Sequence, residues 1–565
     1  MHTPDQHHTP WTFGLLAVCV ALPWLNPFAS SPSTAVIPLL LSWMLAACAL
    51  LVVVEMPLVK KPWALRDRWW LAFMGAWLMA SLVWVPAVVD RALTAGLLAS
   101  LMCVWLMWAV GRRAALNQHL LTWLMTAVLL AAMVSSVLGI LQYLGLAQAL
   151  SPWVNQPLKG DAFANLRQRN QFASLTALGL VALLGWTLMR SKTNALTASA
   201  WCVIVLSLNL LAAGLACSVS RTGAIEWLLV TALVVWWLCR QSPREGRRSL
   251  LALVLAAPCL VVLWSVTLPW LSLQITGEWG ASLILRVAGQ TQDYGICGSR
   301  RVLWANVLTL IAQQPWWGWG WGATDYAHFM TLYQGMRFCD MLDNAHDFPL
   351  HLALELGVPF ALVSLAAMAA WVWRRRPWQE TDAWRVMAWC WLLILGLHSL
   401  LEYPLWYGPF QMTLGLTMGL LWSAPHASLE PNVQNKAQIE AQAGPILVSA
   451  LLFIGCVYAA WDFNRVGQIY RPAASRDAAY RDNPLHHAKQ SWLFKNQADF
   501  AELTTQTVTA ENAALLYPQA LRLMHYSPEA RVVQRVIDSA KLLGHDAQAQ
   551  ALADRLEDVK QNMPR

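Results

Sequence analysis

Residues 249–271 read SLLALVLAAPCLVVLWSVTLPWL, a stretch without one charged side chain. A helix needs roughly 20 apolar residues to cross a hydrocarbon core of about 30 Å, so this stretch is long enough to span a membrane. Arg247 and Arg248 precede it directly, and basic residues favour the cytoplasmic end of a span. The stretch therefore predicts a transmembrane helix that begins on the cytoplasmic side.

Similar apolar runs recur along most of the chain. Of its 565 residues, 57% are hydrophobic and 12% are charged, whereas a soluble domain carries roughly 25% charged residues. We expect an all-α polytopic membrane protein with about 13 transmembrane helices, the runs that reach the crossing length. The expected spans are 11–29, 35–54, 69–89, 93–110, 120–147, 171–189, 197–217, 222–239, 249–271, 349–373, 384–401, 403–422 and 445–460.

Basic residues predict the orientation of these spans. With the N-terminus in the cytoplasm, Lys or Arg occurs at every cytoplasmic connection, as the positive-inside rule requires. The formal charge of +8 is then a topology signal, and we expect no nucleic-acid partner. The inner positions are Lys60, Lys61, Arg66, Arg68, Arg112, Arg113, Arg190, Lys192, Arg240, Arg244, Arg247, Arg248, Arg374, Arg375, Arg376, Arg385 and Lys436.

The polar first ten residues lack the basic region of a secretory signal, and we expect them to stay in the mature protein. In this orientation, residues 148–170, a long loop at about 272–348 and the tail all lie on the outer face. A loop of that length is usually functional or has its own structure. We therefore divide the chain into a transmembrane domain, 1–460, and a small helical outer domain, 461–565.

The tail is rich in alanine and charged residues, with a helical pattern. Ser527 stands where an N-cap belongs, and Gly544 stands where a C-terminal cap belongs. Asp546 can then begin a second helix. The sequence predicts an antiparallel helix pair here.

Two of the 11 cysteines, Cys297 and Cys339, fall in the long outer loop. An oxidising compartment allows a disulfide between them, and no His or Cys stands beside either one at zinc-ligand spacing. Asp340, Asp343 and Asp347 in the same loop match no calcium-loop spacing. We expect the disulfide, and we expect neither a metal nor a cofactor.

Arginines suited to phosphate binding occur on the same face. Arg221 begins a span in the motif SVSRTG, and Arg300 and Arg301 stand in the long loop. Arginine donates paired hydrogen bonds to phosphate oxygens and stays protonated, so these residues are candidates to hold a diphosphate. The alternatives are a snorkelling side chain for Arg221 and a solvated pair in the loop.

Candidate acid–base groups lie at two positions of that face. His346 closes the long loop, and an imidazole can take a proton from an acceptor hydroxyl near neutral pH. His398 and Glu402 are four residues apart and are expected to share a helix face. Tyr403 follows, and Pro404 is expected to break the helix. The alternatives are a solvated loop histidine and a structural His–Glu pair that fixes two helices.

Further motifs stand in order around these candidates. They are Arg300 to Trp304, Pro315 with Gly318, Gly320 and Gly322, the segment Asn344–Ala345–His346–Asp347, Leu350, and Glu355–Leu356–Gly357. This order resembles the central signature of the O-antigen ligase and polymerase superfamily, although Asp347 stands where that family usually has Asn. The motifs similar to the branch that glycosylates proteins are Asn165 to Gln171, His398 to Tyr407, Asp462 to Arg465, and Gln468 to Tyr470.

The resemblance implies a PglL-like protein O-oligosaccharyltransferase of the bacterial inner membrane, with a periplasmic active site and C-terminus. Members of that branch move an oligosaccharide from undecaprenyl diphosphate to Ser or Thr of exported proteins such as pilins. His346 then matches the essential histidine, while Arg221 and Arg300 match phosphate-binding arginines, with Arg301 as the alternative register. The implied motif positions near the site are Gln168, Asn170, Gln171, His398, Glu402 and Tyr403.

Other functions remain as rivals at this point. A lipopolysaccharide O-antigen ligase would use lipid A-core as the acceptor, and a glycan polymerase would use another glycan. The soluble tail favours a protein acceptor over both. A lipid-glycan transporter is a different class, but its polar groups belong near the midplane of the membrane, whereas the candidates here gather at one face.

Overall fold

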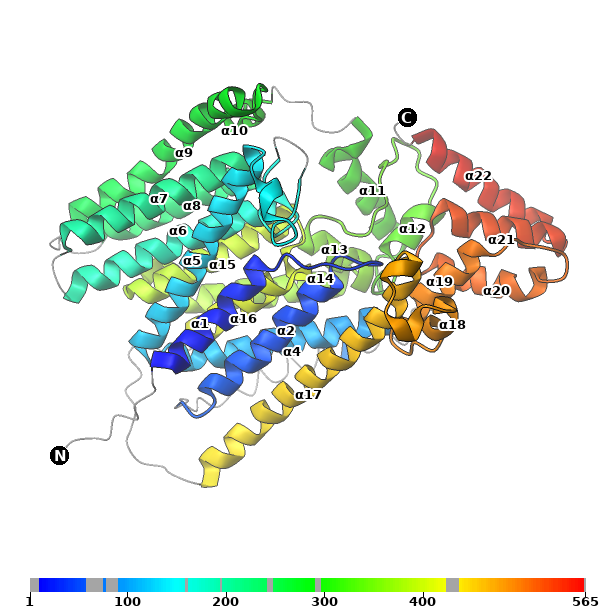
Figure 1. Ribbon diagram of the computed structural model, residues 1–565, viewed down its shortest axis with the longest axis horizontal. Helices are drawn as coiled ribbons and strands as arrows, with labels where there is room; N and C mark the ends of the chain where they lie inside the picture. Colours follow the sequence, from blue (N-terminus) through cyan, green and yellow to red (C-terminus); the bar gives the residue numbers. More distant parts are fainter. Residues whose placement is uncertain are drawn as a thin grey trace.

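The computed structural model describes residues 10–56, 75–77, 90–157, 161–193, 196–240, 247–289, 296–422 and 436–562, and the named elements of these residues are all helices (Figure 1). Nine helices of the described part are long and apolar enough to cross a membrane. They are α2 (Val36–Val53), α4 (Arg91–Ala114), α5 (Gln118–Tyr143), α6 (Arg169–Thr193), α7 (Ala198–Ser218), α8 (Arg221–Arg240), α9 (Arg247–Thr276), α15 (Ala383–Leu401) and α17 (Lys436–Gly467).

A polytopic membrane protein is therefore confirmed, but the expected count of spans is not. Of the expected span 69–89, only residues 75–77 are described, and these are helical. Helices α1 (Pro10–Leu25) and α16 (Gly408–Trp422) are apolar but shorter than the nine. The basic residues that lie outside the described part, wholly or in their side chains, are Lys60, Lys61, Arg66, Arg68, Lys192, Arg244 and Lys436.

The single span expected at 349–373 is wrong, because two helices occupy it. α13 (Phe348–Leu356) and α14 (Val358–Arg375) are separated by Gly357, whose φ is +87°. A Cβ atom on Gly357 would lie 2.1 Å from the carbonyl oxygen of Trp316. Only glycine permits this left-handed conformation together with such a close approach. The tryptophan-rich run thus packs directly against the break between the two helices.

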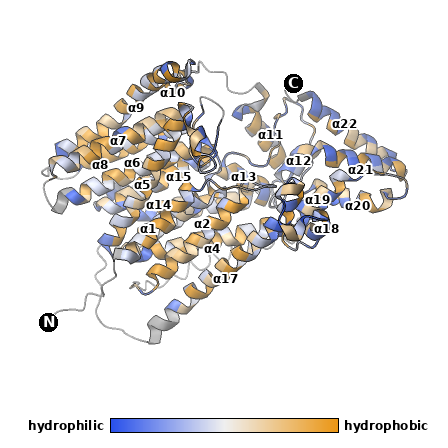
Figure 2. Cartoon of the chain, in the orientation of Figure 1, coloured by the Kyte–Doolittle hydropathy of each residue, from blue (hydrophilic) through white to orange (hydrophobic). Residues whose placement is uncertain are grey.

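The tail consists of short helices that are more polar than the bundle (Figure 2). Helix α21 (Ala530–Leu542), Gly544 with φ +77°, and α22 beginning at Asp546 agree with the predicted pair. The predicted N-cap at Ser527 is wrong, since Glu529 occupies that position and Ser527 Oγ donates to its carboxylate at 3.2 Å. The remaining tail helices are α18 (Pro484–Lys489), α19 (Lys495–Thr505), α20 (Ala513–Met524) and α22 (Asp546–Asn562).

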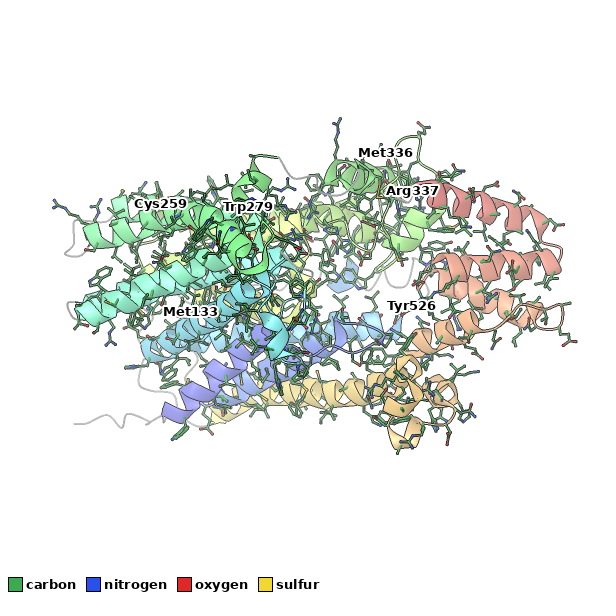
Figure 3. All side chains as sticks on the ribbon, turned by 45° about the horizontal axis from the view of Figure 1, so that its top comes forward. Met133, Cys259, Trp279, Met336, Arg337 and Tyr526 are labelled. Carbon is green, nitrogen blue, oxygen red and sulfur yellow. A yellow bond between two sulfur atoms is a disulfide. The ribbon has the colours of Figure 1, made fainter. Side chains whose placement is uncertain are left out.

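The long loop is folded and contributes to the core of the tail. It contains α10 (Leu283–Val287), α11 (Arg300–Gln313) and α12 (Thr324–Met330). Phe329 of α12 is buried among apolar side chains of α19 to α22. Arg337 pairs with Asp558 of α22 at 3.5 Å, and Figure 3 shows Arg337 next to that helix. The loop and the tail therefore pack as one unit.

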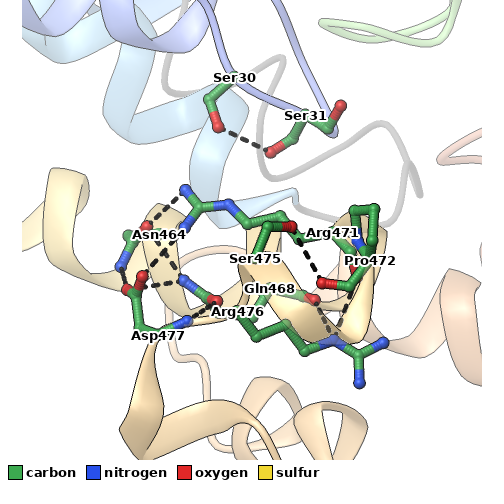
Figure 4. A network of polar contacts seen from close by, with 9 residues as sticks. All are labelled: Ser30, Ser31, Asn464, Gln468, Arg471, Pro472, Ser475, Arg476 and Asp477. Atoms are coloured by element: carbon green, nitrogen blue, oxygen red, sulfur yellow. Dashed lines mark hydrogen bonds and ion pairs between the residues drawn. The ribbon is translucent and has the colours of Figure 1, made fainter.

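A polar network fixes the tail to the end of α17. Asn464 and Gln468 both donate to the Asp477 carboxylate, at 2.9 and 2.8 Å (Figure 4). Arg471 donates to Asn464 Oδ1 at 2.9 Å, and Arg476 Nε donates to the carbonyl of Gln468 at 3.2 Å. The tail motif singled out in the sequence thus forms the junction through which α17 continues past residue 460 into the tail.

Candidate functional site

His346 lies in a tight turn that leads into α13. Its backbone has φ +51°, and its N–H donates to Asn344 Oδ1 at 2.9 Å. Trp304 of α11 holds the turn from the other side, since its indole N–H donates to the carbonyl of Ala345 at 3.2 Å. Asp347 caps α13 by accepting from the N–H of Leu350 at 2.9 Å. Together these contacts fix the position of the imidazole.

Glu402 approaches His346 from the end of α15. The helix ends at Leu401, and Glu402 follows in an extended conformation with φ −155°. Its Oε2 lies 2.8 Å from His346 Nδ1. The predicted shared face of His398 and Glu402 is therefore wrong, because Glu402 has left the helix. Pro404 explains the break, since proline disfavours helical conformation in the residues before it.

Arg300 and Asn170 hold the other oxygen of the Glu402 carboxylate. Glu402 Oε1 accepts from Asn170 Nδ2 at 2.7 Å and also from Arg300 Nη2. Ser220 holds Asn170 in turn, because its hydroxyl donates to Asn170 Oδ1 at 2.7 Å. One cluster thus brings together four parts of the chain. They are the first turns of α6 and α11, the end of α15, and the connection between α7 and α8.

The charge state of Glu402 follows from these contacts. Burial alone would raise the pKa of its carboxyl, but the hydrogen bond with His346 and the charge of Arg300 outweigh burial and lower the pKa. Glu402 is therefore ionised at neutral pH, and because an ionised carboxylate only accepts hydrogen bonds, His346 Nδ1 is the donor in their contact. Nε2 remains to accept a proton from a hydroxyl, and the side chain is 25% exposed. Tyr403 contacts the ring edge-on, with centroids 4.8 Å apart.

His398 belongs to a second, deeper network. Its Nδ1 lies 2.8 Å from Ser174 Oγ, which in turn lies 2.7 Å from Glu226 Oε1. All three side chains are buried. Sequence reasoning missed Ser174, Glu226 and Ser220. A carboxylate inside the apolar span of α8 was the available signal, since such groups mark functional or pairing positions in membranes.

The remaining candidates surround this cluster. Gln168 accepts from the backbone N–H of Gln171 at 2.7 Å at the start of α6, and Gln171 is buried. Arg221 is exposed and follows Ser220 directly, at the first position of α8. Arg301 is also exposed, whereas Arg300 contacts Glu402. Of the two loop arginines, Arg300 is therefore the one that the fold brings to His346.

Cys297 and Cys339 are joined by a disulfide, with their Cα atoms 5.4 Å apart. This bond closes the segment that holds α11 and α12. Within the described residues, no group of three or more His, Cys, Asp or Glu side chains has a geometry suited to a metal ion.

Known protein families match the chain over the ranges that supply this cluster. The O-antigen ligase family matches residues 203–364, which include Arg221, Arg300 and His346. The chain is similar to the O-antigen ligases over these residues. It shares with that family the segment from α7 to α14, which holds the histidine turn and both arginine positions.

Two more families of this kind match the rest of the site. The protein glycosylation ligase family matches residues 162–188, and the C-terminal region of virulence factor membrane-bound polymerases matches residues 386–559. A general O-oligosaccharyltransferase of Acinetobacter baylyi is 23% identical over 423 residues, which cover 72% of this chain and 69% of the relative. The likeness thus extends well beyond the ligase core.

Proposed function

We propose that this chain transfers a preassembled oligosaccharide from a lipid-linked diphosphate onto a Ser or Thr hydroxyl of a protein. The observation that carries the proposal is the contact of His346 Nδ1 with the Glu402 carboxylate at 2.8 Å. This contact fixes the tautomer and leaves Nε2 as a base. The base shares the Glu402 carboxylate with Arg300, the residue type that best binds phosphate oxygens.

The proposed step is a displacement at the anomeric carbon of the donor. The acceptor oxygen bonds to that carbon while the carbon–oxygen bond to the diphosphate breaks, and the diphosphate leaves with the bonding electrons. His346 Nε2 takes the hydroxyl proton, and the Glu402 carboxylate stabilises the resulting imidazolium. Because a diphosphate is a good leaving group, no acid is needed to protonate it, in contrast to glycoside hydrolysis.

Arg221, Arg300 and Arg301 are the proposed diphosphate ligands. The guanidinium of Arg300 has five N–H donors, so its contact with Glu402 leaves donors for phosphate oxygens. Arg221 lies one residue from Ser220, which holds Asn170. Positive charge placed before the reaction stabilises the charge that develops on the leaving group.

A protein acceptor is supported by the relative that is named an O-oligosaccharyltransferase and by the match to protein glycosylation ligases. The O-antigen ligase match is the ground for keeping lipid A-core as the rival acceptor, but it does not favour that acceptor over a protein. A transporter is disfavoured, since His346, Glu402 and Asn170 lie at or next to helix ends, whereas transporter sites are expected near the midplane of the membrane. The donor we propose is undecaprenyl diphosphate-linked, the acceptor is an exported protein such as a pilin, and the site faces the periplasm of a bacterial inner membrane.

The deciding experiment offers both acceptors to the purified chain in lipid nanodiscs. A lipid-linked oligosaccharide is supplied with a pilin-like protein in one reaction and with lipid A-core in the other. Glycosylation of the protein alone supports the proposal, and glycosylation of lipid A-core alone overturns it. His346→Ala should lose all detectable transfer because the hydroxyl then has no base. Near-normal transfer by this variant would remove His346 from the mechanism.

A further inference from the structure

A cavity of about 280 Å³ lies where the tryptophan-rich run, α13 and the tail meet the start of α4. Figure 3 places Tyr526 of its wall where the tail helices face the rest of the molecule. The proposed function gives this cavity no role. Its walls are formed by Asp90, Leu93, Trp321, Gly322, Ala323, Thr324, Asp325, Asp343, His351, Glu355, Trp406, Asn496, His525 and Tyr526.

One aromatic side chain, Tyr403, lies between the proposed base and a residue of the cavity wall. Tyr403, which contacts His346 edge-on, also meets Trp406, with ring centroids 6.3 Å apart. Trp406 lines the cavity and contacts His351 at 4.9 Å. His346 and the wall residue Trp406 therefore both contact the same ring, that of Tyr403. A glycan whose first sugar reacts at His346 can place a following sugar in the cavity.

The wall combines flat apolar faces with hydrogen-bonding groups of both kinds. Trp321 stacks on Trp406, with centroids 6.1 Å apart and ring planes 17° apart. His351 is only 2% exposed, and within the described residues neither its Nδ1 nor the indole N–H of Trp321 has a hydrogen-bond partner. The side chain of Asn496 offers both a donor and an acceptor. Aromatic faces flanked by such mixed groups suit a pyranose ring.

We propose that this cavity is a subsite for one uncharged sugar residue of the transferred glycan, and that its carboxylates exclude acidic sugars; the proposal rests on the proposed function. Burial raises the pKa of Asp325 to about 8, so its carboxyl is largely protonated at neutral pH. The carboxylates that line the space beside it are Asp90, Asp343 and Glu355. A uronic acid would bring a further negative charge against them, and like charges at short range repel strongly where water is partly excluded. Sugar hydroxyls donate to the carboxylates instead.

Two alternative occupants, a metal cation and a lysine side chain, fit the wall less well than a neutral sugar. The described carboxylates form no cluster of metal-binding geometry. A lysine ammonium of an acceptor protein only donates hydrogen bonds, so it would offer nothing to the indole N–H of Trp321. A hydroxyl both donates and accepts, and it therefore serves both kinds of group in the wall.

The test measures binding directly, without transfer. The full chain in nanodiscs is mixed with methyl N-acetylglucosaminide or with methyl glucuronide, and saturation-transfer NMR reports which one binds. We expect the neutral glycoside to bind and the glucuronide to bind about tenfold more weakly. Asp343→Asn is an isosteric change at an exposed position. Because it removes one negative charge from the wall, it should reduce the difference in affinity between the neutral glycoside and the glucuronide. Trp321→Ala should remove binding, whereas Trp316→Ala, a matched change at a 71% exposed tryptophan outside the cavity wall, should leave it unchanged.

The His346→Ala variant separates this inference from the proposed function. It should lose transfer and still bind the neutral glycoside, so that failure of one idea leaves the other standing. A lysine-containing peptide is the competing probe. Binding of that peptide without glycoside binding would overturn the sugar subsite, and so would equal binding of both glycosides or glycoside binding that survives in both Trp321→Ala and Asn496→Ala.

Discussion

The two carboxylate oxygens of Glu402 have different partners. Oε2 contacts His346, and Oε1 accepts from Arg300 and Asn170. One charge thereby orients the imidazole and balances the guanidinium. The resemblance of the motifs indicated all four residues. The motif spacing did not indicate their contacts, because Glu402 was expected to stay on the helix of His398. Pro404 predicted a break in the helix, but the i, i+4 spacing did not indicate that the break comes before Glu402 and turns its side chain toward His346.

Glu402→Gln keeps the size of the side chain and removes its charge. We expect transfer to fall about 100-fold, since the amide stabilises the imidazolium poorly and positions it less firmly. Transfer of a labelled oligosaccharide to the acceptor protein measures the effect. Glu380→Gln is the matched control, because Glu380 pairs with Arg385 at the opposite end of α15 and its loss should leave transfer near wild type. Similar losses in both variants would point to a folding defect and not to a role at the site.

Arg221→Lys tests the phosphate role of an exposed residue at the start of α8. Lysine keeps the charge but lacks the planar fork that binds two phosphate oxygens at once. We expect transfer to fall roughly tenfold, with protein level in the membrane unchanged. Wild-type transfer by the lysine variant would mean that Arg221 only anchors its helix at the interface.

At the scale of elements, apolar runs predicted most helices within a few residues, because lipid leaves a backbone few options other than a helix. The break at Gly357 was missed, since the apolar run continues through it. The break is determined by the backbone of Trp316, which packs closely against Gly357. These residues are so far apart in the sequence that no local pattern indicates the contact. The same holds for α12, whose place in the core of the tail depends on long-range packing.

The disulfide between Cys297 and Cys339 should be found in protein taken from intact cells. Mass mapping of non-reduced peptides measures it. Closing a loop restricts the unfolded chain and so stabilises the folded one by roughly 3 kcal/mol or more. Cys297→Ser should therefore destabilise the folded segment that carries Arg300 and lower transfer several-fold. Cys202→Ser, at an exposed cysteine outside the loop, is the control. Free thiols at both loop positions would refute the prediction.

At the scale of the whole molecule, arginines occur at both ends of the bundle. Arg112, Arg113 and Arg240 lie in the last turns of α4 and α8, whereas Ser220 and the site lie at the opposite end of α8. The positive-inside rule places the end with Arg112, Arg113 and Arg240 in the cytoplasm, and a site on the outer face stays a prediction from the sequence. In the orientation predicted from the sequence, the long loop and the tail share the site's side.

Fusions to alkaline phosphatase, which is active only outside the cytoplasm, test that orientation. Fusions after residue 330 and after Arg565 should be active, and a fusion after Arg244 should be inactive. The reverse pattern would place His346 in the cytoplasm and would exclude reaction with a donor that faces outward.

Phe329 of the long loop is part of the hydrophobic core of the tail. This packing limits how the tail can be exchanged between related chains. If residues 461–565 alone were transplanted onto a relative in order to change the acceptor, Phe329 would stay behind. The transplanted tail would then lack a side chain that packs in its hydrophobic core. The unit of exchange is therefore discontinuous. A working chimera has to carry α12 together with the tail, because neither piece contains a complete interior alone.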